Sequence, residues 1–307
     1  MLDDMELPIS VIICAHNPRS NYLEMVLAAL KSQTLSKDFW ELLLVDNASD
    51  KILASEIDLS WHPQARHIRE EKLGLTPARL RGIKEAQAQV LVFVDDDNVL
   101  DSDYLEATWR ISKDFSIIGA WGGLIKPEFE ETPPSWTKPY LGMLAIREFE
   151  RDQWSNSINQ YETVPCGAGL CVRKTVAQKY ADLVNMNPKR ASMGRKGKLL
   201  TSCEDSDLAL TACDEGLGTG VFTSLKLTHL IPSNRLKEDY LLRLAEGLSY
   251  SQTMLAYFRG TVSSESLWKS SKIYLLYLSL RYGFRVSRLY EAGQKGRKLA
   301  LKEIANL

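Results

Sequence analysis

The chain has 307 residues, of which 45% are hydrophobic and 25% are charged, so it can bury a sizeable core and has the composition of a soluble globular protein. The formal net charge of −1 gives no electrostatic basis for a nucleic-acid partner. Residues 1–7 are acidic and too short for a secretory signal, and the longest apolar run of the tail, residues 273–280, is far shorter than the ~20 residues that span a bilayer.

Five cysteines are spread along the chain, and none of them forms a CxxC pair. An odd number of cysteines at such spacings predicts neither a disulfide framework nor a zinc site, and it fits a reducing cytosol. We therefore expect a cytoplasmic protein. The cysteines are Cys14, Cys166, Cys171, Cys203 and Cys213.

The first third of the chain alternates short apolar runs with segments of helical periodicity. The predicted strands are residues 9–14, 41–45, 65–68 (the weakest) and 90–94, and the predicted helices are residues 21–33 and 77–88. Thr76 is the expected N-cap of the second helix, with Pro77 at its first position. Repeated strand–helix–strand order predicts an α/β fold with an open, mostly parallel sheet flanked by helices.

The rest of the chain has a different character. Residues 127–139 hold four of the eleven prolines and are expected to form a loop, as are the polar residues 185–198. Helices are predicted for residues 205–215, which Gly216 ends, for residues 236–258 and for two later stretches. We therefore expect a core at 1–232, with a nucleotide-binding half at about 1–125 and an acceptor half at about 126–232, and a helical region at 233–307.

Polar residues follow three of the predicted strands directly. They are Ala15, His16 and Asn17; then Asp46, Asn47, Ala48, Ser49 and Asp50; then Asp95, Asp96, Asp97 and Asn98. Ligands of open α/β sheets bind outside the carboxyl ends of the strands, where such residues meet. Each cluster taken alone also has the chemistry of an ordinary turn or helix cap.

The run Asp95-Asp96-Asp97 is the sharpest of these signals. Three adjacent carboxylates repel one another, and this run follows a buried strand, which fixes its position and removes part of its water. Carboxylate oxygens suit Mg²⁺ or Mn²⁺, which usually share their site with substrate phosphates. The alternative is a solvated acidic turn.

These motifs, taken in order, resemble the family 2 glycosyltransferases of the GT-A fold. The resemblance covers residues 8–232 and rests on Val11 to Asn17, Leu44 to Asp50, Gly74 to Gly82 with Ala78-Arg79, and Val94 to Asp97. It implies inverting transfer of a sugar from a nucleotide-diphospho sugar, with a UDP-sugar as the favoured donor and Mn²⁺ or Mg²⁺ as cofactor. The sequence departs from the family pattern at Cys14-Ala15-His16 and at Leu80, which bear on the nucleotide contacts.

The resemblance also implies roles for single residues of the donor site. Asp46 is expected to contact the nucleobase, Ala15 and Asn17 to line the nucleoside pocket, and Arg79 to lie near the nucleotide. Asp95 is expected against the ribose, with Asp96 beside it, and Asp97 is expected to ligate the metal.

A second carboxylate pair, Glu204-Asp205, begins a predicted helix, where acidic residues are favoured electrostatically in any protein. Its place in the order matches the Glu-Asp motif of the family. The resemblance therefore implies that Asp205 is the general base and that Glu204 orients or binds the acceptor. His229 is expected either to complete the metal shell or to be a structural histidine.

Small residues between predicted strands resemble the acceptor loop of the family. Gly167, Ala168 and Gly169 would let the backbone approach a substrate closely, and Trp121 is expected in the same cleft. The alternatives are a tight turn for the glycines and a core position for the tryptophan.

The C-terminal tail is basic. From residue 261 to the end there are nine Lys or Arg and three Glu residues, a local net charge of +6. Six of the cations recur at helical spacing, which is typical of a helix that lies on an anionic membrane surface, although an ordinary packed helix with a solvated basic face has the same pattern. They are Arg281, Arg285, Arg288, Lys295, Lys298 and Lys302.

We therefore expect an inverting glycosyltransferase that acts on a glycan or lipid-linked acceptor in cell-surface polysaccharide or glycolipid synthesis, at the inner face of the membrane. Two alternatives remain at this point. A sugar nucleotidyltransferase would need a glycine-rich loop after the first strand, and residues 15–20 contain no glycine. A non-catalytic carbohydrate-binding or nucleotide-sugar-binding module would be favoured by loss of the carboxylates, and both clusters are present.

Overall fold

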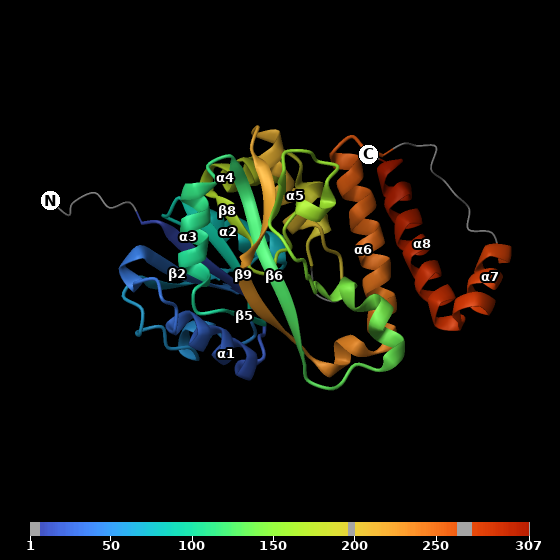
Figure 1. Cartoon of the computed structure of the whole chain (residues 1–307), viewed down its shortest axis with the longest axis horizontal. Helices are drawn as coiled ribbons and strands as arrows, with labels where there is room; N and C mark the ends of the chain where they lie inside the picture. The colour runs from blue at the N-terminus through green and yellow to red at the C-terminus, as the bar shows by residue number, and fades with distance from the viewer. Residues whose placement is uncertain (1–6, 196–199, 263–271, 307) are drawn as a thin grey trace.

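The computed structural model describes residues 7–195, 200–262 and 272–306. The expectations for residues 1–6, for 196–198 of the predicted loop and for 263–271 of the basic tail lie outside the described residues. The described chain forms a mixed sheet with helices on both faces and a group of helices beside it at the C-terminal end (Figure 1). This is the α/β architecture that the sequence predicts.

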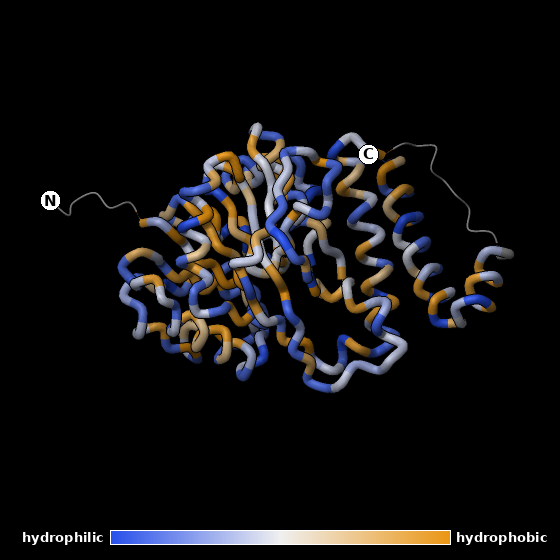
Figure 2. The backbone as a smooth tube through the Cα atoms, viewed as in Figure 1, coloured by the Kyte–Doolittle hydropathy of each residue, from blue (hydrophilic) through white to orange (hydrophobic). Residues whose placement is uncertain are grey.

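Four parallel strands form the first half of the sheet. They are β1 (Ile9–Ala15), β2 (Trp40–Asn47), β3 (Ala65–Glu70) and β4 (Val90–Asp95), in the order β3-β2-β1-β4. All four predicted strands are confirmed. Strands β1, β2 and β4 are buried along nearly their whole length because helices cover both faces of the sheet, and they are correspondingly hydrophobic (Figure 2).

Helices cover the two faces of the sheet in two groups. Side chains of α1 (Ser20–Lys31) and α3 (Tyr104–Asp114) share one buried cluster with one face of the strands. Side chains of α2 (Leu75–Glu85), α4 (Lys174–Met186) and α5 (Glu204–Asp214) share a second cluster with the other face. The carboxyl ends of β1 and β4 therefore open at one edge, between these layers.

Helix α2 begins at Leu75, two residues before the predicted first position, Pro77. Gly74, with φ of 139°, is the capping residue in place of Thr76, and its amide donates to the Asn47 side chain at 2.8 Å. Few residues other than glycine adopt this backbone conformation. A Cβ on Gly82 would lie 2.5 Å from Ile12 Cγ2, so α2 lies directly on β1 and holds Arg79 under the end of the sheet.

The second half of the sheet is mostly antiparallel and continues the sheet beyond β4. It consists of β8 (Cys171–Arg173), β6 (Ile118–Phe129), β9 (Gly218–Ile231) and β5 (Asn98–Leu100), with β7 (Gln153–Ser155) paired to β9. Strand β9 runs parallel to β6 and antiparallel to β5.

The proline-rich loop predicted at residues 127–139 is shorter than expected. Strand β6 continues through Pro127 to Phe129 because it stays paired with β9, with Pro127 opposite His229. The end of the predicted loop is helical, in the 3-10 helix η3 (Ser135–Leu144). Likewise, α4 runs into the predicted loop at 185–198, which continues as η5 (Pro188–Met193).

Three α-helices of the described chain follow the sheet: α6 (Glu238–Phe258), α7 (Lys272–Tyr282) and α8 (Phe284–Ile304). Helix α8 lies along α6 so closely that a Cβ on Gly296 would be 1.9 Å from the Glu246 carbonyl oxygen. Helices α6 and α8 also contribute to the buried cluster that covers the sheet, through Met254, Leu255 and Ala300. At Gly283, with φ of 95°, the chain turns from α7 into α8.

Half of the predicted basic stripe faces acidic side chains of α6. Arg285 and Arg288 pair with Glu238, and Lys295 pairs with Glu246 at 2.9 Å. These three cations therefore hold α8 against α6. Among the described residues, no helix is both long and apolar enough to cross a membrane.

Candidate active site

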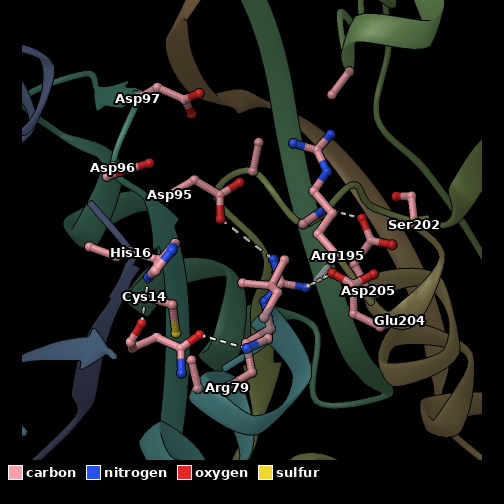
Figure 3. Close-up of a pocket in the computed structure, with 18 of the residues that line it drawn as sticks. Cys14, His16, Arg79, Asp95, Asp96, Asp97, Arg195, Ser202, Glu204 and Asp205 are labelled. Atoms are coloured by element: carbon pink, nitrogen blue, oxygen red, sulfur yellow. Dashed lines mark hydrogen bonds and ion pairs between the residues drawn. The ribbon is translucent and has the colours of Figure 1, made fainter. Parts of the chain in front are cut away.

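A pocket of about 260 Å³ opens at the carboxyl ends of β1 and β4. Its walls come from the start of α2, the segment around Gly167, the start of α5 and the end of β9. The three aspartates of the acidic run lie on one side, and Glu204 and Asp205 lie on the other (Figure 3). The two carboxylate clusters, distant in sequence, thus share one cavity.

Most of the predicted site residues line this pocket. They are Ala15, Arg79, Asp95, Asp96, Asp97, Gly167, Ala168, Glu204, Asp205 and His229. Asn17, Asp46, Gly169 and Trp121 do not line it.

Asp46, the expected nucleobase contact, holds the loop after β2. Its carboxylate accepts the amides of Ser49 and Leu53 and a 2.7 Å ion pair from Arg69. Burial disfavours its charge, but the hydrogen bonds from Leu53, Ser49 and Arg69 outweigh that effect and lower the pKa of Asp46. Its carboxylate therefore fixes the loop that follows β2.

Asn17 also acts between loops. Its side chain donates to Asp50 at 3.1 Å and accepts the Asp50 amide at 2.9 Å, while its own amide donates to Ser49. The loops after β1 and β2 are therefore tied together. Asn17 itself has φ of 47°, a conformation that asparagine tolerates better than most residues.

Gly169 and Trp121 lie behind the pocket. A Cβ on Gly169 would be 2.5 Å from the Tyr104 hydroxyl, which donates to the Gly169 carbonyl. Trp121 is fully buried, with Arg173 over its ring. Both residues support the wall of the pocket from within the core.

Arg79 lies at the floor of the pocket and links both carboxylate clusters. Its guanidinium is 3.1 Å from Glu204 and 3.6 Å from Asp95, and it stacks over Phe93. Burial works against its charge, but Glu204, Asp95 and Asp205 outweigh it and raise the pKa of Arg79. Burial also raises the pKa of Glu204 to about 7, although Arg79 opposes this shift.

Asp205 meets the predicted acceptor loop directly. Its Oδ2 accepts the Gly167 amide at 2.7 Å, and its Oδ1 accepts the Ser206 amide at 2.7 Å. A Cβ on Gly167 would lie 2.6 Å from Arg79 Nη2 and 3.0 Å from Asp205 Oδ2. Glycine is therefore required here for the loop, the arginine and the carboxylate to approach one another.

Asp97 and His229 converge at the far side of the pocket. Pairing of β5 with β9 sets Asn98 opposite His229, and the Leu230 amide donates to the Asp97 carbonyl at 2.9 Å. Asp97 Oδ2 and His229 Nε2 lie 3.5 Å apart. The Arg235 guanidinium contacts both atoms, at 2.9 Å and 3.0 Å.

These donor groups fit a divalent metal. A guanidinium can only donate, so His229 Nε2 accepts and presents a lone pair, as a metal ligand must. The positive charge of Arg235 lies where a metal ion would lie, between the Asp97 carboxylate and the His229 imidazole. Within the described ranges, no three His, Cys, Asp or Glu side chains form a ligand set by themselves, so a metal here would take further ligands from a diphosphate and water.

The acidic run carries excess negative charge. Burial, followed by the charges of Asp97 and Asp95, raises the pKa of Asp96 to about 7. Burial opposes ionisation of Asp97 too, but its interactions with His229, Arg235 and Arg195 outweigh burial and bring the pKa of Asp97 to about 2. Asp97 is therefore an anion that already attracts a cation.

Three further lining residues of evident chemical interest were given no role from the sequence: His16, Arg195 and Arg235. His16 stands in the first polar cluster and is 2.8 Å from the Asn47 carbonyl oxygen through Nδ1. Arg195 belongs to the segment expected to be a loop, and its carbonyl accepts the Leu75 amide at the start of α2. The only sequence feature that could have pointed to Arg235 is its closeness to His229, six residues earlier in the chain.

The five cysteines are free thiols, one of which, Cys14, lines the pocket. Burial raises the pKa of each of them, to about 12 for Cys14 and Cys171. Their thiolate forms are therefore scarce at neutral pH.

An open α/β sheet, with an acidic cluster at the end of its fourth strand and a carboxylate pair facing it, has the architecture of the GT-A fold. The chain belongs to glycosyl transferase family 2, whose family model matches residues 10–175, more than half of its length. The resemblance noted in the sequence is thereby confirmed.

Curated relatives match over shorter stretches. Glycosyltransferase AglE of Haloferax volcanii is 33% identical over 101 residues, which is 32% of this chain and 33% of AglE. Putative glycosyltransferase EpsH of Bacillus subtilis is 28% identical over 114 residues, which is 36% of this chain and 32% of EpsH. The match thus spans about a third of the length of these relatives.

Solved structures share the fold along almost the whole chain. GalNAc-T7, solved with UDP, GalNAc and Mn²⁺, has a TM-score of 0.52 at 16% identity, covering 99% of this chain and 57% of that one. TarS of S. aureus has a TM-score of 0.51 at 16% identity, covering 96% of this chain and 55% of that one. At this identity the likeness concerns the fold.

Proposed function

We propose that the protein transfers a sugar from a UDP-sugar to an acceptor hydroxyl with inversion at the anomeric carbon, in a metal-dependent reaction. The observation that carries the proposal is the shared pocket, in which Asp97 and His229 form a cation position across from Asp205. The donor diphosphate needs a cation, and the acceptor hydroxyl needs a base on the other side of the reacting sugar. A non-catalytic module would have no use for both.

Asp205 is the proposed general base. Two backbone amides hold its carboxylate in one orientation, and it keeps part of its surface in the pocket. A base must reach the proton it removes, and Glu204, buried against Arg79, is less able to do so. Glu204 is therefore the proposed positioning residue, which fixes Arg79 beneath the loop at Gly167.

Asp97 and His229 are the proposed metal ligands. A bound Mn²⁺ or Mg²⁺ would neutralise charge on the leaving diphosphate. Asp95 and Asp96 remain the proposed contacts to the donor, together with Ala15, while Asn17 and Asp46 hold the loops around it. The UDP and Mn²⁺ in the GalNAc-T7 structure support this choice of nucleotide and metal.

The acceptor is proposed to be a glycan, carried on a lipid at an anionic membrane surface at the inner face of the membrane. Helix α7 supports this view because it presents a row of exposed apolar side chains beside the basic Arg281. Several of them are more than half exposed: Leu276 (60%), Tyr277 (51%), Leu280 (80%) and Tyr282 (57%), with Phe284 (69%) at the start of α8. Their ring and aliphatic surfaces suit a lipid–water interface.

The proposal is tested with a panel of UDP- and GDP-sugars, each with and without Mn²⁺, in a hydrolysis and transfer assay. We expect one UDP-sugar to be consumed, and nuclear magnetic resonance of the transferred product to show the inverted anomer. Asp97→Asn should abolish turnover and weaken UDP binding in the presence of Mn²⁺. His229→Ala should raise the Mn²⁺ concentration needed for half-maximal rate.

Full activity in excess EDTA, or unchanged metal dependence in both variants, would contradict the metal site. Asp58→Asn is the matched control, because Asp58 lies in a surface turn and bonds only Ser60 among the described residues. It should leave turnover and metal dependence as they are.

A further inference from the structure

Arg235 occupies the position between Asp97 and His229 that a metal ion would take. It belongs to the 3-10 helix η6 (Ser233–Leu236), directly after β9. Its Nη2 donates to Asp97 Oδ2 at 2.9 Å, and its Nη1 donates to His229 Nε2 at 3.0 Å. The other Asp97 oxygen already accepts the Asn98 side chain at 3.0 Å. The guanidinium thus contacts both of the proposed ligand atoms.

A metal would need the same two atoms. The imidazole has one free lone pair, at Nε2, and an N–H donor and a metal cannot share it. Arg235 and a metal ion therefore cannot both bind His229 Nε2 at the same time. Arg235 therefore competes with a metal ion for Asp97 and His229.

Once a diphosphate is bound, arginine alone does not balance the negative charge of the site. Among the described residues that line the pocket, five carry carboxylates and three carry guanidinium groups. A diphosphate adds further negative charge, so a divalent ion is still favoured when the donor arrives. The carboxylates are Asp95, Asp96, Asp97, Glu204 and Asp205, and the arginines are Arg79, Arg195 and Arg235.

The donor offers Arg235 a new partner. Its side chain is 20% exposed and lines the cavity, so it has room to turn toward a ligand there. A guanidinium binds phosphate oxygens through paired hydrogen bonds at least as well as it binds a single carboxylate oxygen.

We propose that Arg235 is an exchangeable cation that closes the metal position of the nucleotide-free protein and is released by the donor diphosphate. The inference rests on the proposed metal site. It deepens that site, because it makes metal and nucleotide binding cooperative. Each ligand strengthens the other by the same factor, as linkage requires.

The test measures Mn²⁺ binding by electron paramagnetic resonance, first without nucleotide and then with saturating UDP. In the wild type, UDP should raise the Mn²⁺ affinity by about tenfold or more, a factor that corresponds to a typical coupling between sites. Arg235→Ala should bind Mn²⁺ without UDP about tenfold more tightly than the wild type, and UDP, which still supplies ligands to the metal, should then raise the affinity by a smaller factor than in the wild type. Arg235→Lys should fall between them, because a lysine cannot contact both atoms as a fork.

Arg195→Ala is the matched control. It removes one positive charge from the same pocket without touching Asp97 or His229, so it reports how much of the effect is general electrostatics. Circular dichroism of each variant establishes that it is folded.

Nucleotide-free affinities that are equal in the wild type and Arg235→Ala would overturn the exchange, as would an equal gain in Arg195→Ala. In either case Mn²⁺ would still bind with UDP, and the proposed metal site would stand. If no variant binds Mn²⁺ even with UDP, the metal site itself fails, and the exchange fails with it.

Discussion

Arg79 and Glu204 lie 125 residues apart in the sequence and form a buried ion pair of 3.1 Å. The pair connects α2, which lies under β1, to the first residue of α5. Because Asp205 follows Glu204 directly, the same contact fixes the start of the helix that carries the proposed base. Removing one partner of such a pair leaves an uncompensated charge in the core, at a cost of about 3–5 kcal/mol.

The titration of Glu204 should be visible in the stability of the protein. Its pKa is about 7 in the folded chain, against an ordinary value of 4.5, so between these values the folded state holds a proton that the unfolded state has lost. Raising the pH through this window should therefore lower the free energy of unfolding, by up to about 3 kcal/mol. Urea unfolding at pH 5 and pH 8 should show a larger loss for the wild type than for Glu204→Gln. Equal losses would contradict the raised pKa.

Replacing Asp205 by asparagine should lower turnover without weakening the binding of UDP. Asp205→Asn keeps an oxygen to accept the Gly167 amide, so the loop should stay in place and UDP should bind as in the wild type. Turnover should fall by ~10²-fold or more, as loss of a general base implies. Steady-state rates and calorimetric UDP titrations measure the two effects. Near-normal turnover would remove Asp205 from the role of base.

A control on the same helix is Asp214→Asn. Asp214 pairs with Arg259 at the far end of α5, outside the pocket. This variant should keep its turnover, so a comparable loss there would point to a defect in the helix and not in the chemistry.

Two glycines of α8 should respond oppositely to alanine. A Cβ at Gly296 would collide with the Glu246 backbone of α6, so Gly296→Ala should destabilise the protein by about 1–3 kcal/mol. A Cβ at Gly293 would meet only Ser249 at 3.6 Å, so Gly293→Ala should stabilise it by up to about 1 kcal/mol through helix propensity. Thermal unfolding of both variants decides the matter. Equal shifts would mean that α8 does not lie on α6 as described.

Membrane association should depend on the exposed apolar surface of α7 and the start of α8. Full-length protein should float with liposomes that contain anionic lipid, and added salt should weaken the effect. A triple substitution of Leu276, Leu280 and Phe284 by serine should abolish flotation without unfolding the protein.

The control for flotation uses three equally exposed side chains elsewhere. Ile52, Ile117 and Met186 are 58%, 62% and 82% exposed, and they lie outside α7 and α8. Their triple serine variant should still float. If both variants float alike, or if the wild type does not float at low salt, the association with membrane is wrong.

The parallel half of the fold was predictable because its strands are buried on both faces. A continuous apolar run such as Val90 to Val94, with helical segments before and after it, is typical of a buried parallel strand. The antiparallel half was less accessible. Strands β5, β7 and β8 are three residues each and carry little pattern, and Pro127 suggested a loop where β6 continues.

The candidate site was predictable only where side chains cluster in the sequence. The acidic run and the pair at Glu204 stand out as groups, and the structure brings them into one pocket. Arg235 stands alone in a turn, and its meaning depends on where Asp97 and His229 lie. Gly169 follows the pocket residue Ala168 in the chain, but a tight turn directs it to the core, and Trp121 is fully buried in β6.

The raised pKa values of the five thiols affect how the protein can be handled. A thiolate is both the form that reacts with oxidants and the form that ligates metals, and each added unit of pKa makes it about tenfold scarcer at neutral pH. With the pKa of Cys14 raised to about 12, even the thiol in the pocket competes poorly for Mn²⁺. Metal titrations of this protein can therefore be run in buffers free of thiol reductants, which themselves bind divalent ions and would obscure the affinities to be measured.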